Sequence, residues 1–144
     1  MKEFVTNSVE ETKALASKLS IEIEAGTVIG FLGDLGSGKT AFTSGFVKGL
    51  GIESEVSSPT FAICNEYEGG GKKVYHYDMY RIESWDDLYS VGFFDAVGSG
   101  AYVLCEWSEN IFGALEDDAV IIKIEKLDEN KRRITLMNKN EVSS

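Results

Sequence analysis

Cysteine, proline and histidine are scarce in this chain of 144 residues, which contains two, one and one of them. The two cysteines, Cys64 and Cys105, each lie in an apolar run and lack the spacing of metal ligands. A disulfide scaffold and a cysteine zinc site are therefore excluded, and we expect two reduced core thiols. No apolar run approaches the roughly 20 residues that cross a bilayer, and residues 1–10 lack the apolar centre of a signal peptide. These absences predict a cytoplasmic protein with one domain over residues 1–144.

Basic residues are also few, since 14 Lys and Arg stand against 24 Asp and Glu and leave a net charge of −10. The arginines are Arg81, Arg132 and Arg133, and the sequence shows no basic stripe. A surface of this charge repels a phosphate backbone, so we expect no strong direct binding to nucleic acid. The same acidic surface favours docking on a basic protein partner.

Glycine is plentiful, and it is concentrated in a phosphate-loop motif of the Walker A type, Gly-x4-Gly-Lys-Thr. The motif and the next residue supply the candidate nucleotide contacts: Gly33, Asp34, Leu35, Gly36, Ser37, Gly38, Lys39, Thr40 and Ala41. Its glycines permit left-handed dihedrals that aim backbone amides at phosphate oxygens. Lys39 would bring its charge to the terminal phosphates during catalysis, and the Thr40 hydroxyl would bind Mg²⁺. We therefore predict a nucleoside triphosphate with Mg²⁺ as the ligand; the alternative is a glycine turn without a ligand.

The segments on both sides of the motif support the nucleotide interpretation. Residues 27–32 form a short apolar run typical of a buried strand. Residues 40–50 place Phe42, Phe46 and Val47 on one helical stripe with Leu50, and a glycine then ends the helix. A strand, a glycine loop and a helix in this order are the context that a phosphate loop requires.

The rest of the chain predicts a mixed α/β fold. We expect a helix over 8–19 opened by a Ser-x-x-Glu capping box, a short edge strand at 21–24, a helix over 84–91, a buried strand over 101–106, hairpins over 60–78 and 119–138, and a frayed tail over 138–144. This order of elements indicates a P-loop NTPase-like mixed sheet, with parallel strands at the centre, antiparallel hairpins at the edges and helices on both faces.

A carboxylate is expected beside the phosphate loop to help hold the metal, and Glu106 ends an apolar strand where such an acid belongs. The alternative is an exposed acid at a strand end. Trp107 follows it and would either cap the site, face a partner or pack in the core.

A second candidate acid lies in the segment from His76 to Arg81. His76 and Asp78 share one face of a strand, so His76 would orient Asp78 while Asp78 steers a water; a purely structural pair is an equal alternative. Thr60 would sense the terminal phosphate, as switch segments do, or would only start a strand. Arg81 would either reach the transition state or pair with an internal acid.

These residues together resemble the TsaE family. The Walker motif, Ser58-Pro-Thr-Phe61, His76-Tyr-Asp-Met-Tyr-Arg81 and Glu106-Trp107 occur in that family's order and spacing, over nearly the whole chain. The resemblance implies a P-loop ATPase that acts with TsaB and TsaD, and whose ATP hydrolysis supports N6-threonylcarbamoylation of tRNA adenosine 37.

The resemblance also implies roles for single residues. Thr40 and Glu106 would hold Mg²⁺, Asp78 would be needed for hydrolysis, and Trp107 would lie near the nucleotide or the partner. The sequence departs from the family's frequent Thr and Pro at Ala41 and Ser108. Thr6 and Arg133 are the candidates for contacts with adenine.

Three other functions compete with this interpretation. A small-molecule kinase would share the loop, but three arginines are too few to build a lid over the transferred phosphate. A GTPase would need Asn-Lys-x-Asp, and residues 138–141 end in Glu instead. A nucleotide-dependent interaction module would bind ATP without essential hydrolysis. Because no strong general base accompanies the loop, we expect hydrolysis to be slow until a partner orders the site.

Overall fold

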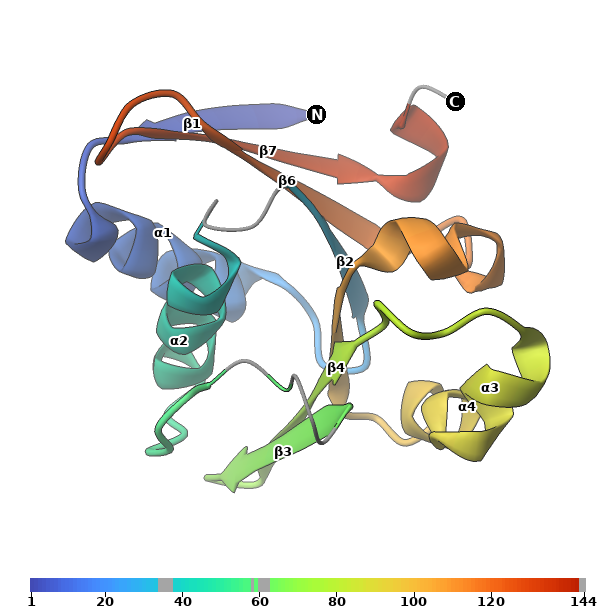
Figure 1. Ribbon diagram of the computed structural model, residues 1–144. Helices are drawn as coiled ribbons and strands as arrows, with labels where there is room; N and C mark the ends of the chain where they lie inside the picture. Colours follow the sequence, from blue (N-terminus) through green and yellow to red (C-terminus); the bar gives the residue numbers. More distant parts are fainter. Residues whose placement is uncertain (34–37, 58, 60–62, 143–144) are drawn as a thin grey trace.

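Two apolar runs, β2 (Val28–Leu32) and β5 (Tyr102–Glu106), pair in parallel at the centre of a sheet. The computed structural model describes residues 1–33, 38–57, 59 and 63–142 (Figure 1). All five residues of β5 are buried, which is why its sequence is apolar until the final glutamate.

The sheet of the described residues has seven strands in the order β1-β7-β6-β2-β5-β4-β3. Parallel pairing joins β6 (Val120–Lys126) to β2 and β4 (Lys72–Asp78) to β5. Antiparallel pairing adds β7 (Arg132–Asn138) and β1 (Lys2–Thr6) at one edge and β3 (Cys64–Gly69) at the other. The prediction of a parallel centre with antiparallel hairpins at the edges is confirmed.

Helices cover both faces of this sheet (Figure 1). On one face lie α1 (Val9–Glu22) and α2 (Lys39–Gly49), and on the other lie α3 (Trp85–Ser90), α4 (Phe93–Val97) and the 3₁₀ helix η1 (Ser108–Ala114).

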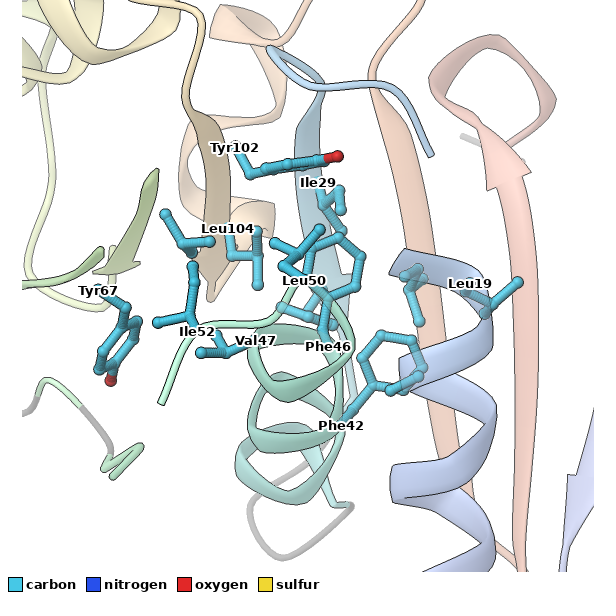
Figure 2. Close-up of a cluster of buried hydrophobic side chains, with 14 of the residues drawn as sticks. Leu19, Ile29, Phe42, Phe46, Val47, Leu50, Ile52, Tyr67, Tyr102 and Leu104 are labelled. Atoms are coloured by element: carbon cyan, nitrogen blue, oxygen red, sulfur yellow. The ribbon is translucent and has the colours of Figure 1, made fainter. Parts of the chain in front are cut away.

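Side chains of β5 alternate between these two layers, so that Leu104 joins the α1–α2 core and Cys105 joins the other. The predicted apolar stripe of α2 is confirmed, since Phe42, Phe46 and Val47 are fully buried (Figure 2).

Two glycines let α1 and α2 pack at backbone contact. A Cβ atom at Gly45 would lie 2.3 Å from the carbonyl oxygen of Lys13, and one at Gly49 would lie 2.5 Å from that of Ser17. Both distances are shorter than any contact that a carbon atom tolerates, so α2 needs glycine at these two positions.

The predicted helix start at Ser8 is confirmed, because its side chain accepts a hydrogen bond from the backbone N–H of Glu11 at 3.1 Å. The predicted edge strand at 21–24 is wrong. Ile21 lies in the last turn of α1 with 76% of its surface exposed, and the true edge strand is β1. Alternation over four residues fits the exposed end of a helix as well as it fits a strand, and here the cap at Ser8 started a helix long enough to include it.

The end of the chain also differs from the prediction of a frayed tail over 138–144. Asn138 is the last residue of β7, and a 3₁₀ turn, η2 (Lys139–Glu141), follows it. The backbone N–H of Lys139 donates to Ala119, and the amino group of Met1 lies 3.1 Å from the Glu141 carboxylate. The sequence missed these contacts because they join segments far apart in the chain.

Short helices were the other elements that the sequence missed, namely α4 and η1. Each spans at most seven residues, which is too short to show a helical period. The longest helix, α1, has 14 residues. Within the described ranges, no helix combines the length and the apolar character needed to span a bilayer.

We expect Gly45→Ala to lower the free energy of unfolding by about 2 kcal/mol or more, because the new methyl group meets the backbone of α1. Urea denaturation followed by circular dichroism measures this change. Gly113→Ala is the matched control: nothing lies within 4 Å of its Cβ position in η1, so stability should stay within about 0.5 kcal/mol. Equal stability of both variants would contradict the role given to Gly45.

Candidate functional site

The predicted phosphate loop begins at the end of β2 and leads into the first turn of α2. Gly33 and Gly38 flank it with φ angles of 145° and 110°, in the region that favours glycine. Gly38 caps α2, whose N-terminal amides carry the positive end of the helix dipole. Thr40 lies exposed in the first turn, and Ala41 is half-buried next to it.

Part of the predicted site falls outside the described residues, namely Asp34, Leu35, Gly36, Ser37 and Thr60. Their predicted roles stay predictions.

The Lys39 side chain is buried between the two ends of the loop, with only 6% of its surface exposed. Its ammonium group donates to the carbonyl of Gly33 at 3.0 Å and lies 4.7 Å from the centre of the Trp107 ring. A carbonyl dipole and an aromatic face both attract a cation, which makes this burial tolerable. The charge is thereby kept between the end of β2 and the start of α2.

Trp107 lies beside this lysine and also packs against the core on the α3–α4 face of the sheet. It adopts left-handed dihedrals with φ 59°, and its half-buried ring packs edge-on against Tyr80 at 5.0 Å. The ring thus contacts both Lys39 and the core, and the predicted roles of Trp107 as a cap or a partner contact stay predictions. The next residue, Ser108, donates its hydroxyl hydrogen to the carbonyl of Phe31 at 2.8 Å and so ties this corner to β2.

Glu106 is a buried carboxylate at the end of β5, with 6% of its surface exposed. One of its oxygens lies 2.6 Å from Nε2 of His76, which is fully buried. A bond this short to an ionised group is strong and fixes the position of the carboxylate.

The prediction that His76 orients Asp78 is wrong, because its bond goes to Glu106. The two residues of β4 share a face as predicted. His76 pairs with Leu104 in the register, so Glu106 lies two residues further along β5, and its side chain reaches the imidazole diagonally between the two strands. The Asp78 carboxylate accepts a hydrogen bond from the backbone N–H of Tyr80 instead.

A hydrogen-bond chain continues from His76 to β3 and to the segment before it. Nδ1 of His76 lies 3.4 Å from the hydroxyl of Tyr67, and that hydroxyl lies 3.2 Å from the carbonyl of Ser57. The amide of Asn65 donates to the same carbonyl at 3.1 Å. The sequence missed Tyr67 and Asn65, although the register of the predicted hairpin places Asn65 opposite His76.

Asp78 ends β4 directly opposite Glu106 in the parallel register. Its Oδ1 accepts a hydrogen bond from the backbone N–H of Tyr80 at 3.0 Å, and its side chain is half-exposed. The structure thus brings both predicted acids to one edge of the sheet, one buried and one open to solvent. Arg81 lies exposed in the turn that follows.

The two candidates for adenine contacts are engaged elsewhere. The Thr6 hydroxyl is buried and shares a 2.7 Å hydrogen bond with Thr12. Arg133 lies 3.2 Å from Glu3 and 3.9 Å from Glu125, on the face of the sheet opposite α2.

Arg132 lies on the α2 face instead, with Nε 3.7 Å from the Cβ position of Gly38. The buried Ile134 two residues later was the signal for this face.

The site contains few ligands for a metal ion by itself. Within the described part of the chain, no three His, Cys, Asp or Glu side chains form a group that could hold a metal. Any divalent cation bound here would therefore need oxygen atoms from its ligand in addition to Thr40 and Glu106. Such a donor set fits a cation that arrives with phosphates.

Comparison with known proteins identifies the family of this chain. A family model described as "Threonylcarbamoyl adenosine biosynthesis protein TsaE" matches residues 6–134. The chain belongs to the TsaE family. TsaE proteins that match it include those of Rickettsia felis, 36% identical over 97% of this chain and 82% of the relative, and of Bacillus subtilis, 39% identical over 90% and 81%. Both carry the name "tRNA threonylcarbamoyladenosine biosynthesis protein TsaE".

A solved structure shares the TsaE fold. The crystal structure of Bacillus subtilis YdiB superposes with a TM-score of 0.78 at 34% identity, over 94% of this chain and 83% of that one. The family resemblance inferred from the motifs is confirmed, and so is the predicted mixed-sheet fold.

We expect His76→Phe to lower the free energy of unfolding by about 1–3 kcal/mol, because it leaves the buried Glu106 carboxylate without its partner. Chemical denaturation of the wild type and the variant measures the loss. Tyr67→Phe is the control, since it removes the hydroxyl's longer contacts with His76 and Asn65 at 3.4 Å and with Ser57 at 3.2 Å but leaves the bond from His76 to Glu106, and it should cost less. A larger loss for Tyr67→Phe than for His76→Phe would contradict this assignment.

Proposed function

We propose that this TsaE family member binds and hydrolyses ATP with Mg²⁺ in support of threonylcarbamoyladenosine formation at position 37 of tRNA. The observation that carries the proposal is the joint position of Lys39 and Glu106. The inward-held ammonium lies beside Trp107, and the next residue back along the chain is the buried carboxylate. A cation and an acid so placed at the amino end of a helix are what a magnesium–triphosphate complex requires.

Lys39 would act on the terminal phosphates. Its ammonium is already close to the loop through Gly33, so a phosphate oxygen only has to replace one carbonyl and one ring face. The free amides at the start of α2 add donors for the same anion. On binding, the Lys39 ammonium would therefore exchange its carbonyl and ring contacts for phosphate oxygens while the fold keeps it in place.

Thr40 and Glu106 would hold the Mg²⁺. Within the described residues, His76 is the one side chain that bonds to Glu106, so the carboxylate has no lysine or arginine partner. A buried carboxylate without a lysine or arginine partner is stabilised by a bound cation. When bound, Mg²⁺ supplies neutralising charge to the phosphates.

Asp78 would position the attacking water. One of its oxygens accepts the Tyr80 N–H, and this bond fixes the orientation of the half-exposed carboxylate. Its place opposite Glu106 at the strand end puts it beside the metal-binding carboxylate without competing for the His76 bond. A fixed acceptor at this position would orient the water for in-line attack.

We propose TsaB and TsaD as partners that complete the site. The net charge of −10 disfavours a direct grip on tRNA. Lys39 is the one basic residue within the phosphate-loop motif, so the charge that stabilises a transferring phosphoryl group is limited. Hydrolysis should therefore be slow for the isolated protein and faster in the complex.

Substitutions separate binding from hydrolysis. Lys39→Ala should weaken magnesium–ATP binding at least about tenfold. Asp78→Asn should keep that affinity and lower the hydrolysis rate about 100-fold, since it loses the water acceptor. Calorimetry and phosphate release, each with and without TsaB–TsaD, measure the two effects.

The outcome for Asp78→Asn also tests the alternatives. Full support of tRNA modification without hydrolysis would indicate an interaction module, and transfer of phosphate to a metabolite would indicate a kinase. Tighter binding of GTP than of ATP would contradict the adenine nucleotide.

A further inference from the structure

An aromatic surface lies on the face of the sheet opposite α1 and α2. Trp85 and Tyr89 are one turn apart on α3 and are 56% and 66% exposed. The Trp85 ring is parallel to that of Phe94 at 5.5 Å, and Tyr89 contacts the same ring at 4.5 Å. The stack joins α3 to α4, which lie side by side (Figure 1). Three contacting rings at a surface form a rigid apolar patch of the kind that anchors protein interfaces.

Hollows flank this stack on both sides. One of about 300 Å³ is lined by Phe93, Phe94, Val97 and Leu115 among other residues. The other, of about 200 Å³, is lined by residues that include Ile82, Trp85, Leu88 and Ile111. Both linings contain Ala114, so the two hollows adjoin and form one continuous surface with the aromatic stack. The surface can therefore take side chains on each side of the rings.

The charged side chains that line the two hollows are all acidic, and Lys139, whose ammonium donates to the carbonyl of Leu115 and lies over the Phe112 ring, is a cation at the margin of the surface. Glu24, Glu116 and Asp118 line the larger hollow and Glu83 lines the smaller, and neither lining contains a lysine, arginine or histidine. Within the described ranges, no ion pair engages these carboxylates or those of the neighbouring Asp86 and Asp95. Unpaired acids around an apolar surface attract cations.

We infer that this surface, formed by α3, α4 and η1, docks a protein partner through a basic segment rich in arginine. A guanidinium group stacks on aromatic faces and pairs with carboxylates, while its aliphatic stem fits an apolar hollow. RNA is disfavoured because its phosphates meet carboxylates, and a second copy is disfavoured because a two-fold contact would bring like charges together. The inference rests on the proposed function in one respect, namely that TsaB–TsaD is the partner that carries the basic segment.

The docking surface and the ATP site are joined by one short segment. Residues 79–84 run from the end of β4 to the cap of α3 at Ser84. Tyr80 in this segment contacts Trp107, which covers Lys39, and Ile82 lines the smaller hollow. A partner seated on α3 thus touches the chain that supports the lysine cap.

Two double variants test the surface. Trp85→Ala with Tyr89→Ala removes the rings, and Glu116→Lys with Asp118→Lys reverses two exposed charges. Each should weaken the affinity for purified TsaB–TsaD at least about tenfold by biolayer interferometry with magnesium–ATP. Glu22→Lys with Glu68→Lys makes the same charge change at exposed residues that line neither hollow, and should alter the affinity less than about threefold.

Other results overturn the inference. Unchanged affinity in both double variants would remove the docking role while leaving the proposed function intact. A dimer in analytical ultracentrifugation, or tRNA binding, that disappears with Trp85→Ala and Tyr89→Ala would assign the surface to that occupant instead. Failure of the wild type to bind TsaB–TsaD would end both the docking inference and the partner part of the proposed function. ATP calorimetry on every variant reports folding and tests the nucleotide part separately.

Discussion

Parallel pairing of β2, β5 and β4 is the constraint on which the site depends. It brings the carboxyl ends of three strands to one edge, where Gly33 leads into the loop and Glu106 lies opposite Asp78. None of these residues is near the others in sequence. Ligand sites form at this edge of open α/β sheets because the last residue of every parallel strand lies there. The helix dipole of α2 then adds a positive end to the same place.

The two carboxylates at this edge, Glu106 and Asp78, differ in how deeply they are buried. Glu106 is buried and bonded to His76, whereas Asp78 is half-exposed and bonded to the backbone N–H of Tyr80. An enclosed anion favours a metal ion as its partner, and an open one can accept a proton or orient a water. Two carboxylates at one sheet edge thus have different surroundings, because strand register and local bonds differ between them, and the two roles proposed for them rest on this difference.

Local signals predicted most of the fold and, with the motifs, the family, while contacts between distant segments escaped prediction. The Ser8 cap, the α2 stripe and the Walker spacing each depend on residues within a few positions of one another. The bond from His76 to Glu106 spans 30 residues and depends on which strands are neighbours. The buried Ile134 is a local signal that places Arg132 on the α2 face and Arg133 on the other, and the prediction that Arg133 contacts adenine stays a prediction.

The backbone contact between α1 and α2 has a mechanical consequence. At Gly45 and Gly49 the backbone of α2 approaches α1 too closely for a Cβ atom, so α2 cannot slide or roll on α1 without a collision of atoms. The helix α2, which begins at Lys39, is therefore held in one position against α1. The first turn of α2, which contains Lys39, therefore keeps a fixed position over the sheet.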